Sequence, residues 1–327
     1  MIRLSLPLLL VVSWCGSSQP PALGAKEPVE TLYGETYAER HDGPLRADAY
    51  LPQGEGPFPG VLVVHGGAWR MGSKAQLGGI ARRLANNGYT AVAINYRLAP
   101  AHPFPAQVLD CQDALRWMRR EAPRLKLDPE RIGGLGYSAG GHLVALLGAL
   151  NGQTLPAQVA AEEADDQDAA AGESQSAGSP EIDESIRLQA VIAGGAPCDF
   201  RPMPLDSFRL VYWLGGTRRA RPNAYRLASP AAFVTPDDPP MFFYHGEADM
   251  LVPVLSPQEM CRELSAAGVP NDLFMVADLG HTPSAGNPEA LVRGLAFFEK
   301  HLKGEAAPAE DRQSPASISA SEAGAAP

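Results

Sequence analysis

The stretch RIGGLGYSAGGHLVALLGAL, residues 131–150, decides the fold of this chain. Residues 131–137 predict a buried strand and residues 139–150 predict an apolar helix, so that Ser138 alone separates the two. Such a sharp turn holds a serine in a strained, exposed position, and its flanking glycines are needed because side chains there would collide with neighbouring backbone. The alternative is an ordinary glycine-rich turn with a capping serine. The strand-to-helix context favours a reactive serine, beside which the free N–H groups of the helix start can stabilise an anion.

Strand and helix patterns alternate on both sides of this stretch. The predicted strands are residues 61–64, 89–94, 131–137, 188–193, 241–244 and 272–276, and the predicted helices are residues 77–87, 107–121, 139–150, 258–267 and 289–302. Residues 31–51 predict two antiparallel strands joined by a turn at residues 41–44. This order predicts the α/β class, with a mostly parallel central sheet and helices on both faces.

The 327 residues are predicted to form one folded domain, residues 25–303. Residues 160–180 contain no aromatic or β-branched side chain and can bury little apolar surface. They are therefore expected to be a disordered insertion, and residues 304–327, which have the same character, a disordered tail.

The formal net charge of −10 is concentrated in these polar segments. Residues 151–186 hold nine carboxylates and no Lys or Arg, and residues 304–327 hold four carboxylates and one Arg, so that the remainder sums to about +2. A nearly neutral body without a dense Lys and Arg patch lacks the charge that nucleic-acid binding requires. No nucleic-acid partner is expected.

Residues 1–24 predict a secretory signal peptide. Arg3 precedes an apolar run at residues 4–12, and small residues follow up to a cleavage site near Gly24 or Ala25. The run is too short to serve as a stable membrane span. We therefore expect an exported protein, periplasmic or secreted.

Three cysteines would remain after removal of this segment: Cys111, Cys198 and Cys261. Their spacing matches no zinc motif, and at most one disulfide can form among them. Buried free thiols are the simpler expectation, and no metal site is expected.

A second glycine-rich turn, His65-Gly66-Gly67-Ala68-Trp69, directly follows the strand at residues 61–64. Consecutive glycines allow backbone N–H groups to approach a ligand closely, as an oxyanion site requires. The amides of Gly66 and Gly67 would act together with the amide of Ala139 on a tetrahedral oxyanion. The alternative is a plain turn between strand and helix. His65 is predicted to organise the loop rather than to act in catalysis.

A serine nucleophile needs a base, and the base needs an acid that orients it. Asp249 follows the strand at residues 241–244, and His281 follows the strand at residues 272–276. Both are therefore expected at the carboxyl edge of the sheet, where Ser138 emerges. The order Ser, Asp, His is that of an α/β-hydrolase.

Other acids and histidines lie near the same loops or elsewhere in turns. Glu247, Asp278 and Asp199 are the alternatives to Asp249, and His245, His301, His41 and His102 are placed less well than His281.

At this point the sequence resembles a known family, the α/β-hydrolase carboxylesterases of the hormone-sensitive-lipase-like group, and within it the secreted acetyl-xylan or feruloyl esterase-like branch. The resemblance covers about residues 51–302. Its motifs are His65-Gly66-Gly67-Ala68-Trp69, Asn95-Tyr96-Arg97-Leu98-Ala99-Pro100 with Phe104-Pro105, Asp128-Pro129 with Arg131-Ile132-Gly133, residues 136–141, residues 249–253 and Gly280-His281.

The resemblance implies an α/β-hydrolase fold and agrees with the roles assigned from the residues. It implies Ser138 as nucleophile with Asp249 and His281 as its partners, and an oxyanion hole made by the glycine loop and Ala139. The chain departs from the family pattern at two positions, since Ala68 replaces a third glycine of many relatives and Tyr137 replaces an aspartate common in lipase-like members. Neither change removes a backbone N–H.

We therefore expect an exported serine carboxylesterase that acts on short acyl esters, with acetylated or feruloylated carbohydrate as a candidate substrate. Trp69, Tyr96 and Phe104 are candidate pocket residues, the alternative being that they pack the loops. The expected partner is a small-molecule or carbohydrate ester, and no metal or organic cofactor is expected.

The sequence leaves two other functions open. A serine peptidase of the prolyl-oligopeptidase-like type would use the same three residues. That group usually carries a large domain before the hydrolase, for which the segment before the first predicted strands is too short. A non-catalytic binding protein on the same fold would normally have lost one of Ser138, Asp249 and His281, and this chain keeps all three.

Overall fold

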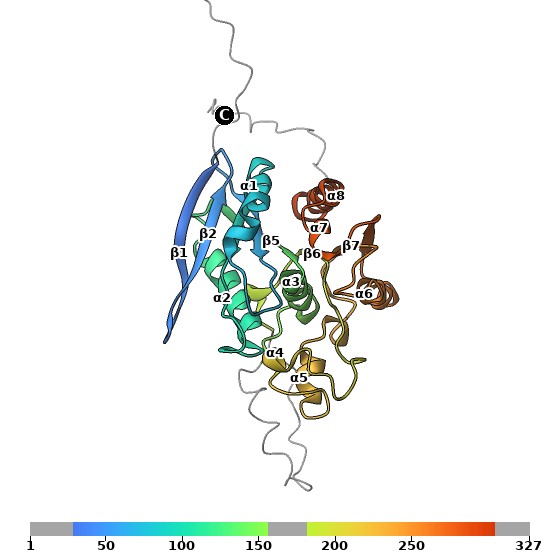
Figure 1. Ribbon diagram of the computed structural model, residues 1–327. Helices are drawn as coiled ribbons and strands as arrows, with labels where there is room; N and C mark the ends of the chain where they lie inside the picture. The colour runs from blue at the N-terminus through green and yellow to red at the C-terminus, as the bar shows by residue number, and fades with distance from the viewer. Residues whose placement is uncertain (1–28, 156–181, 305–327) are drawn as a thin grey trace, which may run out of the picture.

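One eight-stranded sheet runs through the computed structural model, which describes residues 29–155 and 182–304 (Figure 1). Its strands are β1 (Glu30–Arg40), β2 (Gly43–Leu51), β3 (Phe58–Val64), β4 (Thr90–Ile94), β5 (Leu127–Tyr137), β6 (Ala190–Gly194), β7 (Met241–Gly246) and β8 (Asn271–Val276). They lie in the order β1-β2-β4-β3-β5-β6-β7-β8. β2 pairs antiparallel with β1 and β4, and every other pair is parallel. The mostly parallel sheet predicted from the sequence is confirmed.

Helices cover both faces of the sheet (Figure 1). On one face lie α1 (Gly78–Asn86) and α8 (Pro288–Phe298), and on the other lie α2 (Ala106–Arg120), α3 (Ala139–Leu150) and α6 (Leu255–Ala266). Every residue of α3 is buried. This explains why its sequence is apolar on all sides rather than on one stripe.

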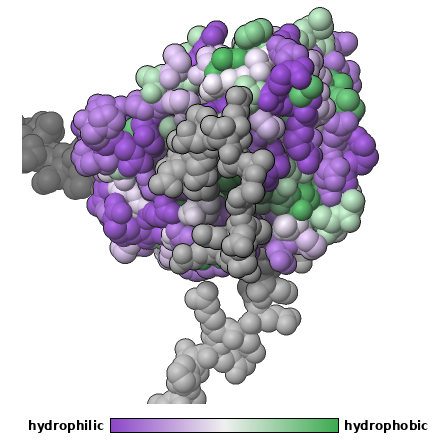
Figure 2. Space-filling model, turned by 90° about the horizontal axis from the view of Figure 1, so that it is seen from below, coloured by the Kyte–Doolittle hydropathy of each residue, from purple (hydrophilic) through white to green (hydrophobic). Residues whose placement is uncertain are grey.

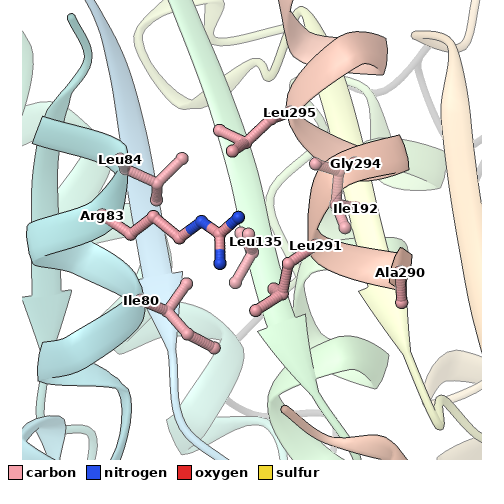
Figure 3. A pocket seen from close by; sticks show the side chains of 9 residues that line it. All are labelled: Ile80, Arg83, Leu84, Leu135, Ile192, Ala290, Leu291, Gly294 and Leu295. Atoms are coloured by element: carbon pink, nitrogen blue, oxygen red, sulfur yellow. The ribbon is translucent and has the colours of Figure 1, made fainter. Parts of the chain in front are cut away.

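The layer made by α1 and α8 packs closely against the sheet. Figure 3 shows the space between the two helices, where Leu84 of α1 and Leu291 of α8 lie on either side of Leu135 of β5. The cavity left there is about 10 Å³, which is at most the size that one water needs. The space between α1 and α8 is therefore too small for a substrate.

Three short helices were not predicted: α4 (Val211–Leu214), α5 (Pro222–Leu227) and α7 (His281–Ser284). The first two lie in a region rich in proline, where the sequence predicts only loops. β5 also begins at Leu127, four residues before the predicted start, because the segment around Asp128 pairs with the beginning of β3.

Several predictions about the ends and the insertion fall outside the described residues. These are the signal peptide at residues 1–24, the insertion at residues 160–180 and, apart from Gly304, the tail at residues 304–327; they stay predictions. Cys111, Cys198 and Cys261 are free, so no disulfide joins them. In residues 29–155 and 182–304, no helix has the length and apolar character needed to cross a membrane.

Candidate active site

Ser138 lies at a sharp turn between β5 and α3, with φ 56° and ψ −122°. The chain can turn there because the flanking glycines lack side chains. A Cβ at Gly136 would lie 2.3 Å from the Gly140 carbonyl oxygen, and a Cβ at Gly140 would lie 2.0 Å from the carbonyl oxygen of Val64. The backbones of β3, β5 and α3 can approach this closely only because residues 136 and 140 are glycines. The surrounding elements hold Ser138 in its strained backbone conformation.

His281 connects Ser138 with Asp249. Its Nε2 lies 2.8 Å from the Ser138 Oγ, and its Nδ1 lies 2.6 Å from Oδ2 of Asp249. A neutral imidazole that donates from Nδ1 to the carboxylate leaves the Nε2 lone pair facing the serine hydroxyl. The structure therefore brings together the three residues that the sequence selected, in an arrangement in which the hydroxyl proton can pass to the imidazole.

Asp249 is held by the loop that follows β7. Its Oδ1 accepts hydrogen bonds from the backbone amides of Leu251 and Val252 at 2.8 and 2.9 Å, and its side chain is fully buried. Burial raises the pKa of the carboxyl, but these two amides and His281 outweigh that effect and hold the pKa below its usual value. Asp249 is therefore ionised at neutral pH. Its 2.6 Å contact with Nδ1 of His281 supports its selection over the alternative acids Glu247, Asp278 and Asp199.

The glycine loop after β3 lies against the serine turn. A Cβ at Gly66 would lie 2.9 Å from the carbonyl oxygen of Tyr137 and 3.3 Å from the Cβ of Ser138, so the backbone of Gly66 approaches the serine closely. Gly67 follows with φ 117°, a conformation that favours glycine. Ala139 is the first residue of α3, where backbone N–H groups have no partner within the helix. Gly66 and Ala139 thus flank Ser138, as an oxyanion site requires.

Ala68 and Trp69 continue this loop in the left-handed region, with φ 51° and 58°. The indole of Trp69 stacks on Trp213 at 3.7 Å between ring centroids, and its Nε1 donates to Nδ1 of His142 at 3.2 Å. Burial lowers the pKa of His142 to about 4. The neutral ring donates from Nε2 to the carbonyl oxygen of Ala228, 2.7 Å away, which leaves Nδ1 free to accept. These contacts hold the strained loop in position.

A cavity of about 710 Å³ opens beside Ser138. Its wall comes from residues in three segments, 68–70, 197–212 and 251–259, together with Ser138 and Ala139. Figure 2 shows the end of the molecule that carries α4 and α5; on its coloured part, hydrophobic residues lie among hydrophilic ones. The cavity has the volume of an ordinary small-molecule site.

Of the three predicted pocket aromatics, only Trp69 lines this cavity. Tyr96 is buried behind the glycine loop, where its ring stacks on His65 at 4.2 Å and its hydroxyl donates to the His65 carbonyl oxygen at 3.0 Å. Phe104 is buried against Trp213, with 5.5 Å between ring centroids. For Tyr96 and Phe104, the pocket assignment is corrected to packing of the loops, and His65 lies in the loop as expected.

Sequence reasoning missed two residues that contact the Ser-His-Asp group. His245, at the end of β7, lies 3.2 Å from Oδ2 of Asp249 and 2.9 Å from the carbonyl oxygen of Val252 through its Nε2. Tyr137 donates from its hydroxyl to the backbone carbonyl oxygen of His281. The sequence offers His245 only as an alternative base and Tyr137 only as a departure from the family pattern; no local pattern indicates either contact.

Tyr137→Phe tests whether this hydroxyl positions His281. Loss of one hydrogen bond of about 1 kcal/mol is expected to lower kcat about fivefold and to leave KM nearly unchanged, because the imidazole moves and the cavity does not. The matched control is Tyr244→Phe, since Tyr244 also donates to a backbone carbonyl, that of Ala285, and has no hydrogen bond to His281. Equal losses of kcat in both variants, or a change confined to KM, would contradict a positioning role.

No group of three or more His, Cys, Asp or Glu side chains suited to holding a metal ion occurs in the described parts of the chain.

The strand order, the serine at the turn after β5, and the acid and histidine after β7 and β8 define an α/β-hydrolase. The chain belongs to the BD-FAE family, whose family model matches residues 47–264. The predicted α/β-hydrolase fold and the resemblance to carboxylesterases of the hormone-sensitive-lipase-like group are thereby confirmed. The acetyl-xylan or feruloyl esterase-like branch stays a prediction.

Individual relatives support the same class. The chain is 31% identical to Esterase LipC of Mycobacterium tuberculosis over 79% of this chain and 61% of that protein. It is 34% identical to the probable carboxylic ester hydrolase LipM of the same organism, over 61% of this chain and 43% of that protein. A truncated form of a carbohydrate esterase from gut microbiota shares the fold, with a TM-score of 0.70 at 24% identity, covering 85% of this chain and 99% of that one. The chain thus spans about half the length of the curated relatives.

Proposed function

We propose that this chain is a carboxylic ester hydrolase with Ser138 as its nucleophile. The observation that carries the proposal is the hydrogen-bonded series from the Ser138 Oγ through His281 to Asp249, at 2.8 and 2.6 Å, beside a cavity of about 710 Å³. A serine, a histidine and a buried carboxylate in this order are what nucleophilic acyl transfer needs. The esterase relatives support the same reaction.

In the proposed first step, the Ser138 Oγ attacks the ester carbonyl carbon while His281 Nε2 takes the hydroxyl proton. The carbonyl oxygen becomes an oxyanion, and the imidazolium that forms is stabilised by the charge of Asp249. Collapse of this intermediate breaks the bond to the alcohol oxygen, which leaves with the proton from His281. The acyl group then remains on Ser138.

In the proposed second step, water attacks the acyl-serine as His281 takes one of its protons. The second tetrahedral intermediate releases the carboxylic acid and returns the proton to Ser138. The amides of Gly66, Gly67 and Ala139 would donate to the oxyanion in both steps. Donors that are already in place need no rearrangement during the reaction. In comparable sites, removing one such donor raises the activation free energy by about 2.7 to 4 kcal/mol.

The test is hydrolysis of 4-nitrophenyl acetate and butyrate by the purified protein, followed by nitrophenolate release. The proposal expects turnover well above the rate in buffer. A panel of acetylated sugars and feruloyl esters then measures acid release on unactivated substrates. Absence of turnover on every ester, with the protein folded, would refute the proposal; cleavage of peptide amides in preference to esters would favour the peptidase alternative.

The finer proposal is that the acyl group is short and that the alcohol part is a carbohydrate. Charged and aromatic side chains in the cavity wall, such as Asp199 and Tyr212, offer partners for sugar hydroxyls and ring faces. The two parts of the ester would share one cavity, so a long acyl chain would compete with the alcohol part for the same wall.

Acetyl and butyryl esters of a sugar are therefore expected to react at least tenfold faster, in kcat/KM, than the decanoyl ester of the same sugar. A decanoyl chain would displace the alcohol part from the cavity wall, and each methylene-sized apolar group returned to water costs about 0.8 kcal/mol, so two such groups suffice for this difference. The series is measured with one alcohol and acyl chains of two to ten carbons. A rise in kcat/KM up to ten carbons would contradict the short-acyl proposal and leave the hydrolase assignment intact.

A further inference from the structure

Two arginines, Arg70 and Arg209, line the cavity beside Ser138. Both side chains are exposed to the cavity or to solvent. Within residues 29–155 and 182–304, neither guanidinium takes part in an ion pair, whereas most other arginines of these residues do. Their charges are therefore available to a molecule in the cavity.

Arg70 is held in a defined place next to the glycine loop. Its guanidinium carbon lies 5.0 Å from the ring centroid of Tyr212, a cation–π contact. The Tyr212 hydroxyl in turn donates to the carbonyl oxygen of Ala68 at 2.9 Å. Arg70 is thus fixed to the loop proposed to supply the oxyanion donors, and a stacked guanidinium keeps its N–H groups free to donate.

The acidic side chains in the wall do not cancel these charges, because each has a cationic partner of its own. Asp199 accepts two hydrogen bonds from Arg201, at 2.9 and 2.7 Å, and Glu259 lies 3.6 Å from Arg262. Arg201 and Arg262 do not themselves line the cavity. The wall of the cavity that Ser138 also lines therefore presents an excess of positive charge.

We infer that the cavity selects esters that carry a carboxylate away from the scissile ester group, with Arg70 and Arg209 binding that carboxylate. The inference rests on the proposed hydrolase function and names the substrate class for it. Guanidinium groups match carboxylates in charge and in hydrogen-bond geometry, and such contacts are stronger than those between neutral groups. The carboxylate can belong to the acyl part or to the alcohol part of the ester, and the test separates the two.

The acyl arm compares 4-nitrophenyl hydrogen adipate, which carries a free carboxylate, with 4-nitrophenyl methyl adipate, its neutral methyl ester. The alcohol arm compares 4-carboxyphenyl butyrate with 4-(methoxycarbonyl)phenyl butyrate. In each arm the measured quantity is the ratio of kcat/KM for the anionic ester to that for the neutral ester. Comparing this ratio between proteins removes differences in chemical reactivity between the two esters.

In Arg70→Gln and Arg209→Gln, the anionic-to-neutral ratio is expected to fall about fivefold to tenfold in one of the two arms. The arm that responds tells which part of the ester carries the carboxylate. In the wild-type protein the same ratio should also fall as NaCl is raised, because salt screens charges at an open site.

Arg83→Gln is the matched control. Arg83 lies on α1 beside the small recess between α1 and α8, away from the cavity wall (Figure 3). Arg83→Gln changes the net charge of the protein by the same amount as Arg70→Gln or Arg209→Gln. It therefore separates an effect at the cavity from an effect of net charge. Its anionic-to-neutral ratio is expected to equal that of the wild-type protein.

The outcomes distinguish this inference from the function on which it rests. Hydrolysis of the neutral esters, with anionic-to-neutral ratios unchanged in both arms by both cavity variants, would overturn the inference and leave the hydrolase assignment standing. An equal fall in the ratio in Arg83→Gln would also overturn it. Absence of hydrolysis of all four esters would overturn both.

Discussion

Ser138→Ala is expected to lose nearly all ester hydrolysis while the protein keeps its fold. Among the described residues the serine hydroxyl hydrogen-bonds to His281, and Ser138 lines the cavity, so loss of the hydroxyl removes chemistry rather than core contacts. A φ of 56° is equally unfavourable for alanine and for serine, so the substitution leaves the strain of the turn unchanged. The activity that remains should be that of the oxyanion donors and binding alone, about 10³ to 10⁴ over the uncatalysed reaction.

The measurement is kcat/KM with 4-nitrophenyl butyrate for wild-type and variant proteins, with circular dichroism and thermal unfolding to compare their folds. Ser265→Ala is the control, because Ser265 lies on α6 and its hydroxyl accepts a hydrogen bond from Asn271, outside the Ser-His-Asp group. A Ser138→Ala protein that retains a tenth or more of the wild-type activity would show that another residue is the nucleophile.

The sequence was sufficient to select the site because the topology does most of the positioning. Parallel strands bring their carboxyl ends to one edge, so residues directly after β5, β7 and β8 must lie near one another. Ser138, Asp249 and His281 occupy those positions, and the structure places them within hydrogen-bond distance. Their catalytic roles stay predictions until activity is measured.

The pocket could not be predicted in the same way, because residue type does not tell which way a loop side chain points. Tyr96 follows β4 and Phe104 precedes α2, yet both rings turn inward. Phe104 does so against Trp213, whose helix α4 lies more than one hundred residues later and has no sequence signal. Segments that are far apart in the sequence form the cavity wall. The sequence alone therefore does not indicate that Arg70 and Arg209 line it.

Asp249→Asn is expected to lower kcat by about 10⁴ with little change in the fold. The introduced amide side chain would keep an oxygen at the position that accepts from the amides of Leu251 and Val252, so the loop after β7 should hold. Its NH₂ group would then face Nδ1 of His281, where Oδ2 of the aspartate now accepts. Two donors cannot pair, so the imidazole would move its proton to Nε2 and present an N–H to Ser138 instead of a lone pair.

Asp278→Asn provides the comparison, because Asp278 is the exposed alternative acid and has a φ of 58°, which asparagine also tolerates. Its kcat is expected to stay within about twofold of wild type, since surface substitutions change little. The two variants are measured together at neutral pH with the same butyrate ester. A large loss in Asp278→Asn with a small one in Asp249→Asn would reassign the acid. A large loss of kcat only in Asp249→Asn would support the proposal that the Asp249 carboxylate sets the tautomer of His281.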